Sequence, residues 1–203
     1  MKSVTAYWDQ RYTLGGTSGA GSEGSEGAWK LHRLLSTADA FDVSSVIDVG
    51  CGDGQIAKPF VRISGVDSYL GIDVSTEIIN RHSVSQPWSS ADVSFTVGDA
   101  ANVGCLDGKS ADMVICLDVL FHVKSQVDHD AVVRNCLRAS RRVTVFTRWT
   151  SDVLRQTKRL GSHCFYHPME SENGYDVKVE QVPGVSFKEF VVVTRQAAES
   201  KVC

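Results

Sequence analysis

The sequence has no long hydrophobic run and no secretory signal at its start. None of its apolar stretches approaches the roughly 20 residues that a helix needs to cross a bilayer, so we expect no membrane span. Residues 1–9 also lack the apolar core of a signal peptide. We therefore expect a cytoplasmic protein.

Cysteine pairs and an excess of positive charge are missing as well. The six cysteines are scattered without a C-x-x-C pair, and several lie in apolar patterns, which favours reduced, buried thiols. The formal net charge of -3 argues against a surface that grips nucleic acid as a whole. A locally basic region after Ser140 is typical of solvated ends of helices and strands.

The chain has the composition of one ordinary globular domain. Its 203 residues can bury a sizeable core, and 42% hydrophobic with 22% charged residues are usual values for such a domain. We predict a single domain over residues 1–203.

Strand-like and helical patterns alternate along most of the chain, which predicts a parallel sheet with helices on both faces. The expected strands are 46–49, 69–73, 93–97, 111–118 and 142–147. The expected helices are 7–12, 27–40, 55–63, a segment through 78–82 that Ser75 caps, and 127–140. The last two β runs, 175–182 and 186–194, are joined by Pro-Gly, too short a connection for a crossover helix, and predict an antiparallel hairpin.

Three alternate glycines end the first of these strands. Gly50, Gly52 and Gly54 allow φ > 0 and let a ligand pack on bare main chain beside the start of the next helix. A dinucleotide site instead reads G-x-G-x-x-G and holds a pyrophosphate there. The carboxylates of Asp48 and Asp53 would repel a pyrophosphate. They suit a ligand with a cationic end, such as the ammonium and sulfonium of S-adenosylmethionine.

Residues 48–54, Asp-Val-Gly-Cys-Gly-Asp-Gly, resemble the first motif of the class I S-adenosylmethionine-dependent methyltransferases, (D/E)-x-G-x-G-x-G. Further landmarks of that family follow in order. Asp73 matches the acid that binds the cofactor ribose, and Asp99, in the turn Gly-Asp-Ala, matches the acid that holds the adenine amino group. Residues 111–118 resemble the fourth strand, which ends in an acid at the transfer site.

This resemblance implies an α/β fold: a Rossmann-like, seven-stranded, mostly parallel sheet with a C-terminal antiparallel hairpin and helices on both faces. It implies S-adenosyl-L-methionine as cofactor and S-adenosyl-L-homocysteine as product. The residues expected to contact the cofactor are Trp8, Arg11, Asp48, Gly50, Cys51, Gly52, Gly54, Gln55, Asp73, Val74, Asp99, Ala100 and Leu117.

The N-terminal segment, residues 1–27, combines a short aromatic helix with a loop rich in glycine and serine. By composition the loop could be a flexible linker. The aromatic residues before it are unusual for a disordered tail, so we favour a lid over the cofactor site that orders when ligand binds.

Two residues after the fourth strand are the candidates for chemistry. Methyl transfer is an in-line displacement that needs a positioned acceptor and, for an oxygen acceptor, a base. Asp118 and His122 leave the strand at the carboxyl edge, where open α/β sheets bind ligands. We expect Asp118 to orient the acceptor or the cofactor ammonium, and His122 to act as the base because its ordinary pKa lies near neutrality. A capping acid and a packed or solvent-facing histidine are the alternatives.

Residues 161–168 lie where this family usually builds its acceptor pocket, which makes His163, Tyr166 and His167 candidate acceptor contacts. The four-residue spacing of the two histidines would suit a metal site on a helix. Pro168 disfavours a helix, however, and no carboxylate or cysteine pair completes a zinc pattern, so we expect no metal.

The acceptor itself stays open. Residues 8–12, 18–24 and 117–122 resemble small class I methyltransferases found beside sugar and secondary-metabolite genes, which favours methyl transfer to an oxygen or nitrogen of a small molecule or glycan. The sequence gives no indication of the oligomeric state.

RNA is the second hypothesis for the acceptor. Lys30, Asp118 and Glu189 fall near three positions of the Lys-Asp-Lys-Glu tetrad of RNA ribose 2′-O-methyltransferases. The fifth strand offers Arg148 in place of the second lysine, and arginine holds its proton too firmly for that role. A third hypothesis, an inactive binding module that keeps the fold, is disfavoured by the complete set of glycines and acids.

Overall fold

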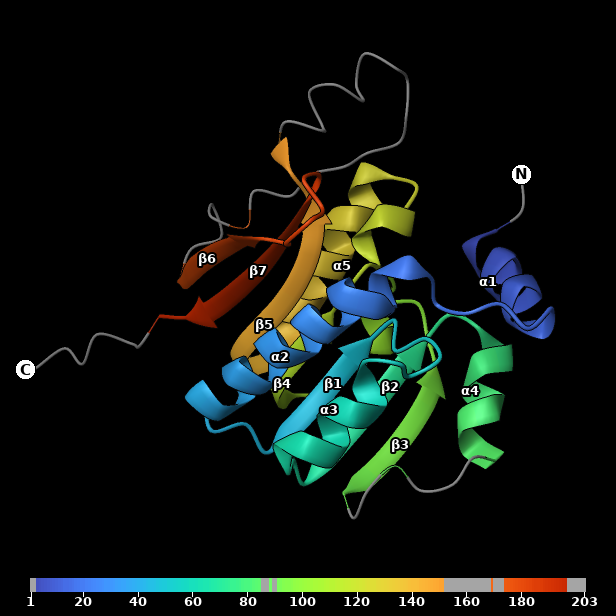
Figure 1. Ribbon diagram of the computed structural model, residues 1–203, viewed down its shortest axis with the longest axis horizontal. Helices are drawn as coiled ribbons and strands as arrows, with labels where there is room; N and C mark the ends of the chain where they lie inside the picture. Colours follow the sequence, from blue (N-terminus) through green and yellow to red (C-terminus); the bar gives the residue numbers. More distant parts are fainter. Residues whose placement is uncertain (1–2, 85–87, 89–90, 152–168, 170–173, 197–203) are drawn as a thin grey trace, which may run out of the picture.

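The computed structural model describes residues 3–84, 88, 91–151, 169 and 174–196, and a seven-stranded sheet forms its centre (Figure 1). The strands are Ser45–Val49 (β1), Ser68–Asp73 (β2), Asp92–Val97 (β3), Ala111–Cys116 (β4), Ser140–Trp149 (β5), Tyr175–Gln181 (β6) and Lys188–Arg195 (β7). They lie in the order β3-β2-β1-β4-β5-β7-β6. The first five are parallel, and β7 runs antiparallel to both β5 and β6. The predicted Rossmann-like sheet with its terminal hairpin is confirmed.

The described residues also contain five α-helices and three short 3-10 turns. The helices are Val4–Thr13 (α1), Gly24–Ala40 (α2), Ala57–Ser64 (α3), Thr76–Val84 (α4) and Gln126–Ala139 (α5). The 3-10 turns are Ala20–Ser22 (η1), Val103–Cys105 (η2) and Leu120–His122 (η3). The predicted cap of α4 is confirmed, because the backbone N–H of Ile78 donates to the hydroxyl of Ser75.

Helix α2 begins three residues earlier than its sequence predicts. Its first turn is rich in glycine and serine, which are poor helix formers, so the sequence of this turn predicts a loop. Contacts with η1 override that propensity: a Cβ on Gly27 would lie 2.4 Å from the carbonyl oxygen of Ser22, so only glycine fits. Helix α2 therefore begins at Gly24, in contact with η1.

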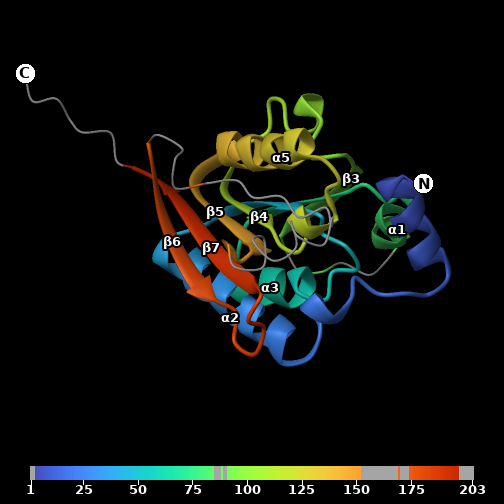
Figure 2. The ribbon, with the colours of Figure 1, turned by 90° about the horizontal axis from the view of Figure 1, so that it is seen from above.

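Helices cover both faces of the sheet, as predicted (Figures 1 and 2). On one face, α5 packs Val133 and Cys136 onto the strands, and on the other α2 and α3 bring Leu34 and Phe60 against them. Four described cysteines are free and three of these are buried, in line with the expected packing thiols. Among the described helices, none is both long and apolar enough to cross a membrane.

The strand directions place several chain segments at one edge of the sheet. Because β1, β2, β3, β4 and β5 are parallel, their carboxyl ends lie together, and the loops that follow them meet there. The antiparallel β7 starts at the same edge, with Lys188 opposite Trp149 in the register. Helix α1 lies beside α4 near this edge (Figure 1).

Candidate cofactor and methyl-transfer site

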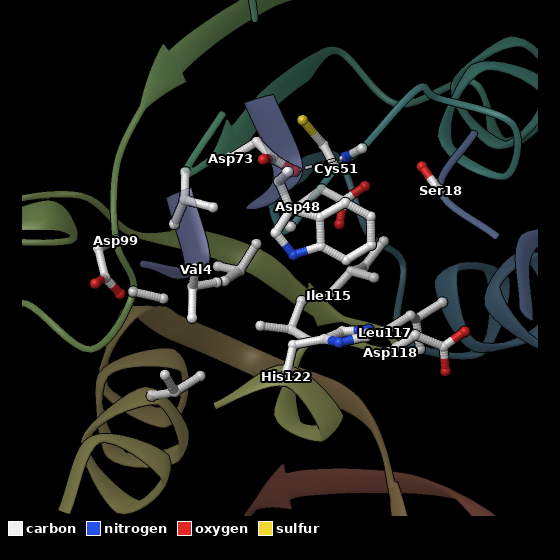
Figure 3. Close-up of a pocket in the computed structure, with 18 of the residues that line it drawn as sticks. Val4, Ser18, Asp48, Cys51, Asp73, Asp99, Ile115, Leu117, Asp118 and His122 are labelled. Carbon is white, nitrogen blue, oxygen red and sulfur yellow. Dashed lines mark hydrogen bonds between the residues drawn. The ribbon is translucent and has the colours of Figure 1, made fainter. Parts of the chain in front are cut away.

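A pocket opens at the carboxyl edge of the sheet. Its walls come from α1, the glycine turn after β1, the end of β2 and the loops after β3 and β4. Figure 3 shows Asp73, Asp99, Asp118 and His122 arranged around it. The residues that we expected to contact the cofactor all line this pocket except Arg11 and Gly54, and the two catalytic candidates line it too.

The glycine turn has the left-handed backbone that its sequence predicts. The φ angles of Gly50, Gly52 and Gly54 are +77°, +52° and +78°. A Cβ on Gly50 would lie 2.2 Å from a methyl carbon of Val119, so close approach as well as conformation requires glycine. Gly54 also leaves room for the ring of Trp88, which would lie 2.6 Å from an added Cβ.

Asp73 is fixed at the end of β2. Its carboxylate accepts hydrogen bonds from the backbone N–H groups of Gly52 (3.0 Å) and Ser75 (2.9 Å). Burial raises the pKa of Asp73, although these bonds oppose the shift. Each carboxylate oxygen has two lone pairs, so the group can still accept from a ligand hydroxyl.

Asp99 also lines the pocket, across it from Asp118 (Figure 3). The carboxylate is exposed and is oriented by the backbone N–H of Ala101 at 3.0 Å. Asp73 and Asp99 therefore both present acceptor oxygens to the pocket. Val49, Ile115 and Leu117 add apolar side chains to the lining, which we call the apolar floor.

The two carboxylates of the glycine turn have different surroundings. Asp48 is buried and accepts a hydrogen bond from the hydroxyl of Tyr69 at 2.7 Å. Burial raises the pKa of Asp48 to about 7, so it is not a permanent charge. Burial acts on Asp53 as well, but hydrogen bonds from Ser18 and Gln55 outweigh it and lower the pKa of Asp53. Of the two, Asp53 is the one held as an anion.

The N-terminal helix is fastened over the pocket. Asp9 accepts hydrogen bonds from the hydroxyl of Ser75 (2.6 Å) and the backbone N–H of Glu77 (3.2 Å) at the start of α4. Trp8 meets the ring of His122 edge-on, with centroids 5.0 Å apart. Arg11, which we expected at the cofactor, instead donates to the carbonyl oxygen of Thr17 at 2.6 Å.

Asp118 lies in a cluster of four charged side chains, Glu26, Lys30, Asp118 and Lys188, which we call the charged cluster. Its carboxylate contacts the ammonium groups of Lys30 (2.6 Å) and Lys188 (3.1 Å). Thr147 also donates to it at 2.9 Å. Burial opposes ionisation, but the two lysines outweigh it and lower the pKa of Asp118, so the carboxylate stays charged and is a poor base.

The predicted RNA-type tetrad is only partly assembled. Lys30 and Asp118 are in contact, but Glu189 pairs with Arg148 at 2.9 Å. Glu26 of α2 and Lys188 of β7 complete the charged cluster instead. The sequence around either residue does not indicate that the two are in contact.

His122 is exposed in η3 at the pocket wall. Desolvation by the surrounding residues lowers the pKa of His122, while the nearby carboxylate of Asp118 opposes that shift. The imidazole is therefore neutral at pH 7 and can accept a proton.

The remaining candidates cannot be placed. His163, Tyr166 and His167 lie outside the described residues. Within the described ranges, no three His, Cys, Asp or Glu side chains are grouped to hold a metal ion.

Sequence reasoning did not single out Ser18 and Tyr12, which also line the pocket. Ser18 binds Asp53 through its backbone and its side chain, and the hydroxyls of Tyr12 and Ser18 lie 3.2 Å apart. The recurrence of serine among the loop glycines was the only available signal for this contact.

The fold and the pocket together define an open α/β protein that binds a nucleoside-type cofactor at the carboxyl edge of its sheet. Residues 46–142 match the model of a family described as a methyltransferase domain. The matched segment holds the glycine turn, Asp73, Asp99 and Asp118, so this part of the chain resembles a methyltransferase domain.

Curated proteins resemble only part of the chain. The ubiquinone biosynthesis O-methyltransferase of Roseobacter denitrificans is 28% identical over 113 residues, 55% of this chain and 44% of that protein. The tRNA U34 carboxymethyltransferase of Trichlorobacter lovleyi is 31% identical over 115 residues, 54% of this chain and 34% of that protein. The chain thus spans less than half the length of these relatives.

A solved structure resembles almost the whole chain. The magnesium protoporphyrin IX methyltransferase from Synechocystis PCC 6803, crystallised with S-adenosylhomocysteine, superposes with a TM-score of 0.69 at 17% identity. The superposition covers 95% of this chain and 98% of that one, which shows a shared fold.

Proposed function

We propose that this protein transfers a methyl group from S-adenosylmethionine to an oxygen or nitrogen of a small molecule or glycan. One observation carries the proposal: a single pocket joins Asp73, Asp99 and the glycine turn to Asp118 and His122 at the end of β4. The residues expected to bind the cofactor and those expected to act in methyl transfer therefore line the same pocket.

The pocket fits the cofactor by the chemistry of its residues. The buried, backbone-oriented carboxylate of Asp73 suits a ribose diol, and Asp99 suits the adenine amino group. The apolar floor suits the faces of an adenine ring, and the bare main chain at Gly50 and Gly52 admits the amino-acid end. The remaining lining residues, including Val74, Ala100 and Gln55, complete the walls.

When bound, S-adenosylmethionine supplies an activated methyl group on a sulfonium. The chain's own part is to orient the acceptor, exclude water and receive a proton. His122, neutral at pH 7, accepts the proton of an acceptor hydroxyl or amine. Asp118 keeps its charge and is fixed by its partners, so it orients a donor group of the acceptor or the cofactor ammonium.

A small acceptor is favoured over RNA by the charged cluster. The carboxylate of Glu189, which an RNA-type tetrad would need, is paired with Arg148. Glu26 and Asp118 together balance the charges of Lys30 and Lys188, so the charged cluster has no surplus of positive charge for a phosphate backbone. His163, Tyr166 and His167 stay candidates for acceptor contacts, and a single domain and a cytoplasmic location stay predictions.

Calorimetry with S-adenosylhomocysteine tests the cofactor site, and we expect one bound equivalent per chain. No binding at concentrations far above the micromolar range would overturn the enzyme hypothesis. Transfer of labelled methyl from the cofactor to fractionated cell extract then tests the acceptor. We expect label in the small-molecule or glycan pool. Label confined to RNA would overturn our acceptor class, and cofactor binding without any transfer would favour an inactive module.

A further inference from the structure

The loop between α1 and α2, residues 14–23, which we call the lid segment, is bonded to the glycine turn. Ser18 donates to Asp53 through its backbone N–H (2.9 Å) and its hydroxyl (2.8 Å), and it accepts from the backbone N–H of Asp53 (2.9 Å). A Cβ on Gly52 would lie 2.2 Å from the Ser18 hydroxyl oxygen. The lid segment therefore rests directly on the turn that the cofactor must approach.

The same segment reaches the charged cluster a few residues later. The ammonium of Lys30 donates to the carbonyl oxygen of Gly21 at 2.9 Å, and it also contacts Glu26 and Asp118, each at 2.6 Å. An ammonium has three N–H donors, and these three acceptors use all of them. Lys30 is 0% exposed, so no water competes for these acceptors while the lid segment is in place.

Asp118 is held by this cluster in an unusual conformation. Its φ is +57°, which a residue with a side chain rarely adopts, and such strain persists only where surrounding contacts impose it. Lys30 contacts one carboxylate oxygen, while Lys188 and Thr147 contact the other. The Gly21 backbone lies against the first oxygen, since a Cβ there would be 2.0 Å from it.

We propose that Lys30 is a positioning residue that couples closure of the lid segment to the orientation of Asp118. With the lid closed, the Gly21 carbonyl is the third hydrogen-bond acceptor of the Lys30 ammonium. This ammonium holds the Asp118 carboxylate at the pocket. With the lid open, Lys30 loses the Gly21 carbonyl as an acceptor, and Asp118 loses the backbone packed against it. Because Ser18 bonds the same lid segment to the glycine turn, opening of the lid exposes the cofactor end and the acceptor end of the pocket together. This consequence rests on the proposed function.

Hydrogen exchange measured by mass spectrometry on the cofactor-free protein tests this coupling. Lys30→Met removes all three donors while keeping an apolar stem. We expect exchange in peptides covering residues 17–23 to rise about tenfold or more, as expected when a closed segment loses a charge-assisted bond. Arg33→Met is the matched control: it lies one turn later on α2 and breaks an ion pair with Glu180 far from the lid. We expect it to leave exchange at residues 17–23 unchanged.

A second variant keeps the test decisive if Lys30→Met does not fold. Gly21→Ala adds a methyl that clashes with Asp118, and it should raise exchange at the lid and speed release of S-adenosylhomocysteine in stopped flow. Gly104→Ala is the control, because it adds the same methyl outside the lid at a glycine that also has no positive φ, with its nearest neighbouring atom 3.9 Å away.

The outcomes separate this inference from the proposed function. Unchanged exchange at the lid in both Lys30→Met and Gly21→Ala would overturn the coupling. So would a uniform rise across the sheet in Lys30→Met, which would mark Lys30 as merely structural, or an equal effect of Gly104→Ala on exchange at the lid. Calorimetry of the unaltered protein with S-adenosylhomocysteine tests the proposed function by itself, because the exchange experiment contains no cofactor.

Discussion

The hydroxyl of Tyr69 donates a 2.7 Å hydrogen bond to the carboxylate of Asp48 directly beneath the glycine turn. Both side chains are buried, and they come from the neighbouring strands β2 and β1. The bond supplies a partner for an acid that would otherwise stand alone in the core, where an unpaired polar group is costly. Asp48, the first acid of the glycine motif, therefore stabilises the end of β1 from which the glycine turn begins.

This relationship predicts a pH dependence of folding. Burial raises the pKa of Asp48 to about 7, above its value of about 4 in an unfolded chain. The folded protein binds this proton more tightly, so the contribution of Asp48 to stability is complete below about pH 4 and is lost as pH rises toward 7. In Asp48→Asn the side chain cannot ionise, so the free energy of unfolding should no longer fall as pH rises from about 4 toward 7. Urea unfolding at several pH values measures it.

The control for this experiment is Asp67→Asn, which changes an exposed acid just before β2. Its stability should follow the unaltered protein at every pH. Parallel pH curves for Asp48→Asn and the unaltered protein would contradict the assignment of the decline to Asp48.

Asp73 should carry a large share of the cofactor affinity. A charge-assisted hydrogen bond of about 1.5–3 kcal/mol is lost in Asp73→Ala, which corresponds to a roughly tenfold to 150-fold weaker dissociation constant for S-adenosylhomocysteine. Asp67→Ala, just before the same strand, is the matched control and should bind normally. If Asp73→Ala bound as tightly as the unaltered protein in calorimetry, the ribose assignment would be wrong.

His122 should control the acidic limb of the reaction. Its pKa is lowered from the usual value of about 6.5, so the base is neutral above that range and the rate should rise with pH only below it. His122→Asn should lose this limb and about 10²- to 10⁴-fold in rate, the usual contribution of a general base. His32→Asn, an exposed histidine on α2, should change neither. An NMR titration of His122 above 6.5, or an unaltered rate profile, would rule out this role.

The sheet and the cofactor clamp could be predicted because their signals are local. The glycine spacing, the acid after each strand and the cap at Ser75 are each read within a few residues of sequence. The start of α2 was missed because contacts between Gly27 and Ser22 outweigh helix propensity.

The charged cluster could not be predicted for a related reason. Lys188 and Glu26 are 162 positions apart, and only the place of β7 beside β5 brings them together. The positive φ of Asp118 likewise depends on partners from three other elements. A pattern within one segment carries no information about such contacts.

Ser18 should stabilise the closed lid mainly at neutral pH. Its hydrogen bonds help to lower the pKa of Asp53, so their stabilising contribution is present above the unfolded pKa of about 4 and is lost as pH falls through the folded value. Ser18→Ala should therefore cost about 1 kcal/mol of unfolding free energy near pH 7 and less in acid. Thr13→Ala, whose hydroxyl donates only to the Asp9 carbonyl, is the control and should show no such pH dependence. A cost for Ser18→Ala that stays constant across this range would mean that the Ser18 bonds do not depend on the Asp53 charge.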